Sequence, residues 1–412
     1  MGLDEYIRDL QRAADIVRSY DRLVLAHHND ADGLSTAAIV MRALEREGIA
    51  VENVPLERVH PKIVKRLIER YSGLVVFVDL GAGAAPVISQ INAGKNTVLI
   101  IDHHHTPGVS DPKVINLSTE LYGVSGDKDI SASCAAYFFA RVLNKENSDL
   151  AYLGVIGAIG DSHHRFGRLE DANRIVLQEA VKRGQVKVVE REGVEDYYLT
   201  VFGGEIRIQD FAKKLTVLGA VGYLMGGPDA GIKAVLEGPG DEYRGMLERL
   251  ETIKKRAFEK VTARLRSEGL RKSKYVQWFH VHDDFAPMGV KVVGEYCMEI
   301  RNSEFVDPEM YLAGFQNMPK EIPRLGVFDW ELVKVSFRLP SKLEEKVVLR
   351  KEMPGYDYII PRAASHVGGD VDACHGYACA TTFNRGLEEM FIKYMDYYIE
   401  EYLIKYGGKN QE

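Results

Sequence analysis

Acidic and imidazole side chains follow three short apolar segments in the first quarter of the chain. They are His28, Asp30 and Asp32 after "LVLA", Asp79 after "LVVFV", and Asp102, His103 and His104 after "TVLII". The carboxyl ends of parallel strands meet at one edge of a sheet, where open α/β sheets bind their ligands. Carboxylates gathered at such an edge repel one another unless a cation neutralises them. The pattern therefore predicts a divalent metal site.

The types of these side chains indicate which metal and which chemistry. Asp161 ends the glycine-containing segment "GVIGAIG", and we expect it to reach the same edge of the sheet. Carboxylates and imidazoles without a thiolate favour manganese, with magnesium as the alternative. This number of ligands suits two ions, and paired divalent ions are typical of phosphoester hydrolysis. The residues by themselves thus point to a two-metal phosphoesterase.

The elements that position these residues alternate between strands and helices. The strands are continuously apolar rather than alternating in polarity, which is typical of a parallel sheet covered on both faces. We predict strands at about 23–28, 51–57, 73–81, 96–107 and 113–117, and helices at about 33–48, 61–71, from 84, 131–146 and 149–160. The fold class is therefore α/β.

The rest of the chain predicts a second, smaller domain. Residues 165–235 look mostly helical, and one long helix with many i,i+4 charge pairs follows at about 240–270. Strand-like segments follow at 275–283, 293–302, 310–317 and 333–340. The pattern of the tail at 387–407 predicts an amphipathic helix. We expect a catalytic domain over 1–238 with a helical insertion, a connecting helix over 239–272, and a smaller α/β domain over 273–412.

Composition restricts the class of protein. The 412 residues carry a formal net charge of −7, and 46% of them are hydrophobic. No apolar run is long enough to span a membrane, and the charged first helix is not a signal peptide, so we expect a cytoplasmic protein. The four cysteines, Cys134, Cys297, Cys374 and Cys379, have no CxxC spacing. We expect them to be reduced and mostly buried thiols.

Four ordered motifs resemble those of the DHH phosphoesterase superfamily. They are "HNDADG", "VDLG", "DHHHT" and "GAIGDS", and their order and spacing fit over residues 20–165. The resemblance implies that Asp79 bridges two ions. It gives His28 and Asp30 to one ion and Asp32, His103 and Asp161 to the other. It also implies that His104 contacts a phosphoryl oxygen and that Asp102 orients the neighbouring histidines, the two residues it assigns to catalysis.

The second domain resembles the DHHA1 substrate-binding domain of the same superfamily. "VKVSFRLP" looks like its strand with Ser-x-Arg, here Ser336 and Arg338. "SHVGGDVDACHGYACATTF" resembles its Gly-Gly-His loop and contains Gly368 and Gly369, although Asp370 follows these glycines. The resemblance therefore leaves either His366 or His375 for the family histidine, and we favour His375.

Local charge and chain size bear on the class of substrate. Between Lys254 and Lys274 there are nine Lys or Arg and two Glu, a local excess that suits contacts to nucleic-acid phosphates. In its size and overall pattern, the chain is similar to archaeal RecJ-like nucleases, including the helicase-associated type. We predict an exonuclease that acts on single-stranded DNA or RNA in DNA repair, with a DNA helicase or a replication or repair factor as partner. Alternatives are a phosphodiesterase of short oligonucleotides or cyclic dinucleotides, and a nucleic-acid-binding replication subunit with a vestigial nuclease.

Overall fold

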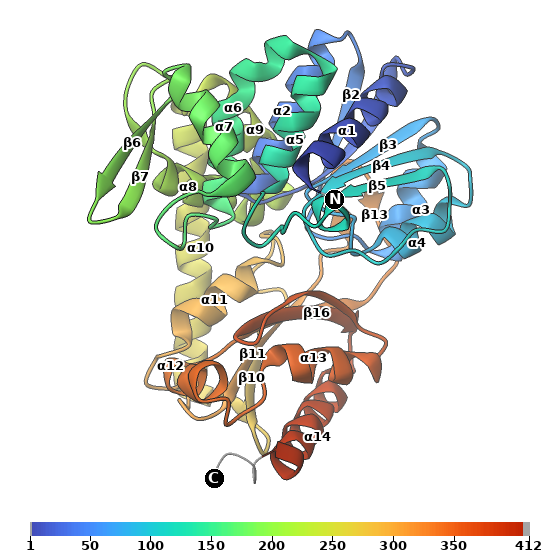
Figure 1. Ribbon diagram of the computed structural model, residues 1–412. Coiled ribbons are helices and arrows are strands. Elements are labelled where there is room, and N and C mark those ends of the chain that lie inside the picture. The colour runs from blue at the N-terminus through green and yellow to red at the C-terminus, as the bar shows by residue number, and fades with distance from the viewer. Residues whose placement is uncertain (1, 407–412) are drawn as a thin grey trace. The chain divides into compact units, whose positions relative to one another are not determined.

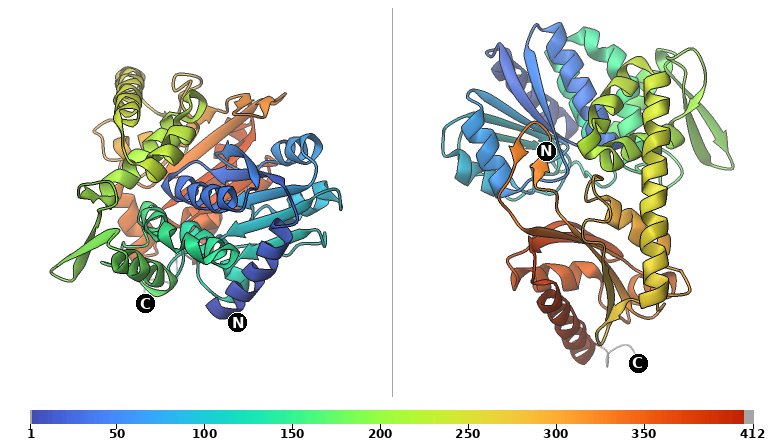
Figure 2. Two further views of the ribbon diagram at one scale, coloured as in Figure 1. Left: turned by 90° about the horizontal axis from the view of Figure 1, so that it is seen from above. Right: turned by 180° about the vertical axis from the view of Figure 1, so that it is seen from behind.

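The computed structural model describes residues 2–406, which form two compact units. The first unit consists of the residues up to Leu250 together with Ile322–Gly326, and the second of the remaining residues. The boundary at Leu250 lies inside α10 (Asp241–Glu268), one continuous helix at the position of the predicted connecting helix (Figure 2). The three-part division into 1–238, 239–272 and 273–412 stays a prediction, and its outermost residues lie outside the described ones.

A five-stranded parallel sheet forms the centre of the first unit (Figure 1). The strands lie in the order β2-β1-β3-β4-β5. Their bounds are Arg22–His28 (β1), Ala50–Leu56 (β2), Leu74–Val78 (β3), Thr97–Asp102 (β4) and Val114–Ser118 (β5). All five residues of β3 are buried, as expected for a strand covered on both faces.

Helices cover both faces of this sheet. α1, α2, α5 and α6 pack together on one side, and α3 and α4 pack together on the other (Figure 1). The bounds are Leu3–Val17 (α1), Ala31–Arg46 (α2), Pro61–Arg70 (α3), Ala85–Asn92 (α4), Ala132–Leu143 (α5), Ala151–Gly160 (α6), Asp171–Lys182 (α7), Ile208–Val221 (α8) and Gly227–Glu237 (α9). The α/β prediction is confirmed.

Among the described residues, no helix combines the length and the apolarity that a bilayer crossing requires.

The strand order creates a switch point beside β1. After β1, the chain passes through α2 to β2 on one side of β1. It then passes through α3 to β3 on the other side, so the direction of strand addition reverses at β1. Helices on opposite faces therefore diverge at the carboxyl ends of β1 and β3, which is the place where ligands bind in such sheets.

One part of the first unit differs from the prediction for residues 165–235. A hairpin of β6 (Val186–Arg191) and β7 (Val194–Leu199), continued by the short β8 (Ile206–Arg207), interrupts the helices. Its two turn residues, Glu192 and Gly193, have φ values of 53° and 80°. A two-residue turn with positive φ at both positions is the favoured hairpin connection. α7, α8 and α9 agree with the prediction, which missed only the hairpin at this Glu-Gly pair between two runs rich in Val and Tyr.

A six-stranded mixed sheet forms the core of the second unit. Its order is β15-β16-β14-β11-β10-β9, and of the strand pairs described in this sheet only β10 and β11 are parallel. The bounds are Arg271–Lys272 (β9), Val276–His280 (β10), Tyr311–Asn317 (β11), Leu332–Arg338 (β14), Asp370–Cys374 (β15) and Ala378–Asn384 (β16).

α13 (Tyr356–Ser365) and α14 (Glu388–Tyr406) cover one face of this sheet and pack on Val333, Val335 and Phe337. α14 lies where the tail helix was predicted, and the last residue of that prediction lies outside the described residues. α12 (Ser341–Glu344) is a short turn of helix.

Residues 293–300 belong to a helix, whereas a strand was predicted at 293–302. α11 (Val292–Ile300) buries residues at helical spacing, namely Val292, Val293, Tyr296, Cys297 and Ile300. This spacing of three and four residues is the pattern of one helix face. The strand prediction was wrong, because the β-branched and aromatic residues of this segment recur at the spacing of a helix.

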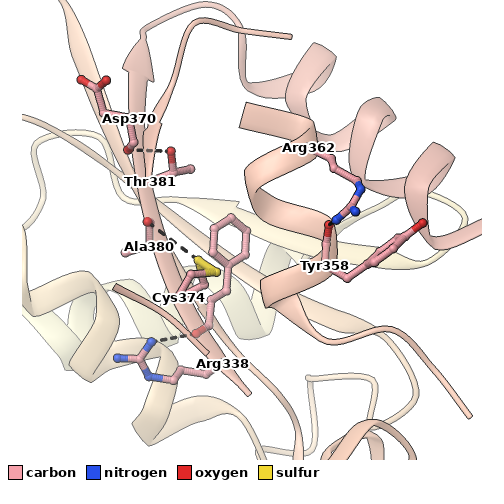
Figure 3. The surroundings of a disulfide bond; sticks show 9 residues. Arg338, Tyr358, Arg362, Asp370, Cys374, Ala380 and Thr381 are labelled. Carbon is pink, nitrogen blue, oxygen red and sulfur yellow. Dashed lines mark hydrogen bonds between the residues drawn. A yellow bond between two sulfur atoms is a disulfide. The ribbon is translucent and has the colours of Figure 1, made fainter. Parts of the chain in front are cut away.

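The cysteine prediction was wrong for two of the four residues. Cys374 and Cys379 are joined by a disulfide between β15 and β16 (Figure 3), whereas Cys134 and Cys297 are buried free thiols. The antiparallel pairing of β15 and β16 places Cys374 opposite Cys379, with their Cα atoms 4.2 Å apart. Four intervening residues do not form a recognisable motif, and only the hairpin brings the two cysteines together.

The hairpin β12 (Glu321–Ile322) and β13 (Gly326–Val327) carries the late segment that belongs to the first unit. The guanidinium of Arg324 donates to both carboxylate oxygens of Asp229 at 2.9 Å and to the backbone and side-chain oxygens of Asn53. Arg66 donates to the carbonyl of Leu325, whose side chain is buried. The first unit is therefore completed by residues from far along the chain.

Close packing of α6 against α2 and α5 yields a stability prediction. A Cβ added at Gly157 would overlap Oδ1 of Asp32 and Oγ of Ser133. Gly157→Ala should therefore lower the free energy of unfolding by about 1–3 kcal/mol, because the helices must move apart. Gly245→Ala is the matched control, since its Cβ would meet nothing within 4 Å inside α10. The control should be neutral or stabilising in thermal unfolding, and equal midpoints for the two variants would contradict the prediction.

Candidate metal centre

Asp79, directly after β3, lies at the centre of the cluster formed by the predicted metal ligands. Its φ of 57° is in the left-handed region, which costs a non-glycine residue conformational energy. Its Oδ1 lies 3.5 Å from Nε2 of His103, and its Oδ2 lies 3.4 Å from Nδ1 of His28. Oδ2 is buried and has no hydrogen-bond partner. Asp79 thus faces the imidazoles at the carboxyl ends of β1 and β4, with one oxygen available to a cation.

His28 and Asp30 provide the β1 side of the cluster. Oδ1 of Asp30 accepts a hydrogen bond from the amide of Gly33 at 3.1 Å and so caps α2. Its Oδ2 lies 2.9 Å from Nδ1 of His28. The N-cap role fixes one carboxylate oxygen, and the other points toward the cluster.

His103 is oriented by a backbone contact. Its Nδ1 lies 2.9 Å from the carbonyl oxygen of Gly126, so Nδ1 carries a proton and Nε2 faces Asp79 and Asp161. A side chain at position 126 would overlap the carbonyl of His103. Burial opposes the charged imidazole, but the carboxylates of Asp79 and Asp161 outweigh it and raise the pKa of His103. The same negative charge favours a metal ion beside Nε2.

Asp102 holds the turn that follows β4. Its Oδ1 accepts from the amide and from Nδ1 of His104 and from the amide of His103, and its Oδ2 accepts from the amide of Ala82 at 2.9 Å. Burial raises the pKa of this carboxyl, but the imidazoles of His104 and His103 outweigh burial and lower it below its usual range. The side chain of His104 is 46% exposed. Asp102 therefore stays ionised and fixes an accessible imidazole.

Asp32 differs from the other predicted ligands. Its Oδ2 accepts from the amide of Ala132 at 2.9 Å, and its Oδ1 accepts from the amide of Ser133 at 3.0 Å, at the start of α5. Burial and the charges of Asp79 and Asp161 raise its pKa. Asp32 lies near the cluster, and both of its oxygens already have backbone donors.

Asp161, at the end of α6, has a partner that is not among the predicted site residues. Nε2 of His163 lies 3.0 Å from Oδ2 of Asp161, and the His163 side chain is buried. The sequence signal was the pair His163-His164 directly after the "GAIGDS" motif. Each histidine alone is common in structural roles, and the pattern did not show which of the two points inward.

The donor set fits divalent metal ions. Within residues 2–406, three sets of side chains have ligand atoms that lie within 4.8 Å of one another: Asp79, Asp102, His103 and His104; His103, Asp161 and His163; and His28, Asp30 and Asp79. Carboxylates and imidazoles without a thiolate suit manganese or magnesium rather than a soft ion. Of the six predicted ligands, five fall in these sets, and Asp32 lies outside them.

The predicted substrate-binding residues lie in the second unit. Ser336 and Arg338 are on one face of β14, where a Cβ at Gly294 of α11 would lie 3.2 Å from Oγ of Ser336 and 3.3 Å from a guanidinium nitrogen of Arg338. The two side chains therefore meet the same glycine. Phe337 points to the opposite face, into the core beneath α13 and α14.

The two candidate histidines of this unit lie in different surroundings. The amide of His375 donates to the carbonyl of Ala378, the residue that pairs with Arg338 across the sheet. His366 instead stacks on Tyr394 of α14 at 4.0 Å, and Gly368 and Gly369 follow it. The strand pairing favours His375 over His366 as the neighbour of Arg338.

Part of the first unit matches a known protein family. Residues 22–159 match the N-terminal domain of the DHH family, so this part of the chain is a DHH domain. An uncharacterized protein from Methanocaldococcus jannaschii is 28% identical over 181 residues, which are 42% of this chain and 40% of that protein. The chain thus spans less than half the length of this curated relative.

Two solved structures share the fold. RecJ from Thermus thermophilus, in complex with Mn²⁺, has a TM-score of 0.62 and 15% identity, covering 96% of this chain and 55% of that chain. An exonuclease RecJ bound to manganese has a TM-score of 0.57 and 16% identity, covering 96% of this chain and 94% of that chain. The fold is therefore RecJ-like.

The position of Asp79 yields a prediction for metal binding. Asp79→Asn removes the charge between the two imidazoles. Loss of an outer partner of a metal ligand costs about 10–100-fold in affinity, and loss of a ligand should cost at least as much. Calorimetric titration with Mn²⁺ measures this change. The control is Asp111→Asn, a buried carboxylate that accepts from Asn92, Gly94 and Lys113 elsewhere in the unit. An equal loss of affinity in both variants would contradict the metal site.

Proposed function

We propose that the protein is a metal-dependent exonuclease that hydrolyses phosphodiester bonds of single-stranded DNA or RNA and releases mononucleotides. The observation that carries the proposal is Asp79, whose buried Oδ2 has no hydrogen-bond partner and which shares ligand sets with His28 and His103 at the switch point of a DHH domain. The RecJ-like fold supports the nuclease class, and manganese, with magnesium as the alternative, is the proposed cofactor.

The cluster residues take the roles that their contacts suit. His28, Asp30, Asp79, His103 and Asp161 would hold two ions, with Asp32 as the sixth ligand. When bound, such ions supply an activated water and stabilise the leaving oxygen of a phosphodiester. Asp102 fixes the imidazole of His104, whose accessible edge would contact a phosphoryl oxygen. Arg338, Ser336 and His375 would bind a substrate phosphate, with Gly368 and Gly369 in the adjoining loop.

The basic stretch of residues 254–274 is not the basis for the proposed substrate. Seven of its nine cations form ion pairs with carboxylates: Lys254, Lys255, Lys260, Arg264, Arg271, Lys272 and Lys274. Paired charges attract phosphates less strongly than an unbalanced cluster. A long single strand is therefore proposed from the RecJ-like fold over 96% of the chain rather than from this helix.

A second candidate is a phosphodiesterase of short oligonucleotides or cyclic dinucleotides, because the same cluster serves any phosphodiester. A replication subunit with a vestigial nuclease is less well supported, since a carboxylate or imidazole stands at each predicted ligand position. A DNA helicase or a replication or repair factor as partner stays a prediction from the family resemblance.

A product ladder tests the proposal. Single-stranded DNA and RNA, labelled at either end, are incubated with Mn²⁺ beside a dinucleotide and a cyclic dinucleotide. Stepwise release of mononucleotides from the long strands is expected, and Asp79→Asn should abolish it. Cleavage of the short substrates alone would favour the second candidate, and strand binding without any product would favour the vestigial subunit.

The second unit yields a separate kinetic prediction. A hydrogen bond to a charged group contributes about 1.5–3 kcal/mol, so Arg338→Ala should raise KM at least tenfold and leave kcat nearly unchanged. Arg362→Ala is the control, because its guanidinium stacks on Tyr358 of α13 at 3.9 Å, away from β14 (Figure 3). Equal KM values for the two variants would remove Arg338 from the substrate site.

A further inference from the structure

We infer that Asn173 fixes the tautomer of His163 so that its Nε2–H positions the carboxylate of Asp161. The inference rests on the proposed metal site and does not depend on the substrate. It assigns His163 as a positioning residue rather than a metal ligand, although its ligand atoms lie within reach of His103 and Asp161. The three residues concerned come from α7 and from the loop after α6.

The orientation of the Asn173 amide is set by the backbone. Asn173 is fully buried on α7, and its Oδ1 accepts a hydrogen bond from the amide of Ser131 at 3.0 Å. A backbone amide only donates, so the atom that faces Ser131 must be the oxygen. The amide nitrogen, Nδ2, therefore points the other way, where it lies 2.9 Å from Nδ1 of His163.

This orientation decides which nitrogen of His163 carries the proton. Nδ2 of Asn173 only donates, so Nδ1 of His163 accepts and Nε2 bears the hydrogen. Nε2 lies 3.0 Å from Oδ2 of Asp161, a distance at which it donates to the carboxylate. The carbonyl of Lys128, 3.2 Å from Nδ1, would prefer the other tautomer, but it is the longer contact. A nitrogen that carries a hydrogen cannot also bind a metal ion.

Asn173 is also linked, through the start of α5, to a second carboxylate of the centre, that of Asp32. Ser131 is the N-cap of α5, and the next two amides of this helix hold Asp32. One buried side chain thus joins the residues that orient Asp161 and Asp32. Partners of this kind fix ligand direction, and their loss costs about 10–100-fold in metal affinity.

The tautomer is measured directly by NMR of the metal-free, ¹⁵N-histidine-labelled protein. Long-range ¹H–¹⁵N spectra distinguish a ring nitrogen with a hydrogen from one without, and the His163→Gln spectrum assigns the signal. We expect Nε2–H in the unaltered chain. In Asn173→Asp the new carboxylate only accepts, so Nδ1 should gain a hydrogen. An Nδ1–H signal in the unaltered chain would overturn the inference.

Metal affinity gives the second readout. His163→Gln keeps a donor near the position of Nε2 and should retain most of the Mn²⁺ affinity, whereas His163→Leu should lose about 10–100-fold. His105→Leu, at an exposed histidine outside the three ligand sets, is the control and should bind as the unaltered chain does. Equal losses in His163→Gln and His163→Leu would overturn the positioning role.

The two proposals fail in different ways. A chain that binds no Mn²⁺ would overturn the proposed function, because its metal site would not exist. A chain that binds Mn²⁺ with His163 in the other tautomer would overturn only the present inference.

Discussion

Negative charge concentrated at the carboxyl edge of one sheet is the constraint on which the first unit depends. Asp79 and Asp161 face the same imidazole, that of His103, and Asp32 and Asp102 lie buried close by. Like charges at this spacing cannot coexist in a protein interior without compensation. Backbone amides compensate Asp32 and Asp102, and histidines stand beside the others. A cation is the remaining way to balance Asp79, whose second oxygen has no hydrogen-bond donor.

This requirement explains the dense packing around the centre. α5 must approach closely enough for its first amides to reach Asp32, and a side chain at Gly157 would separate them. The loop at Gly126 must lie against the backbone of His103 for the same reason. Small residues in these places are a consequence of bringing backbone donors and carboxylates into contact.

Much of this centre could be predicted from the sequence, because the carboxyl ends of parallel strands always lie at the same edge of the sheet. Asp79 and Asp102 each follow a continuous apolar run, and a parallel sheet brings such ends together whatever the loops do. His163 and Asn173 could not be found in this way, because their contact depends on how α7 packs against a loop. The pairing of Cys374 with Cys379 likewise depends on a strand register, and α11 was mistaken for a strand because its composition concealed a helical period.

The segment Ile322–Gly326 gives the chain a topology with a consequence for the first unit. The backbone passes between the two units three times, at Leu250, at Glu321 and at Gly326, rather than once. A fragment that stops at Leu250 lacks the partner of Asp229 and the buried side chain of Leu325, so it is an incomplete domain. The first unit therefore depends for its completion on residues that the chain reaches only after it has entered the second unit, although each unit has a core of its own.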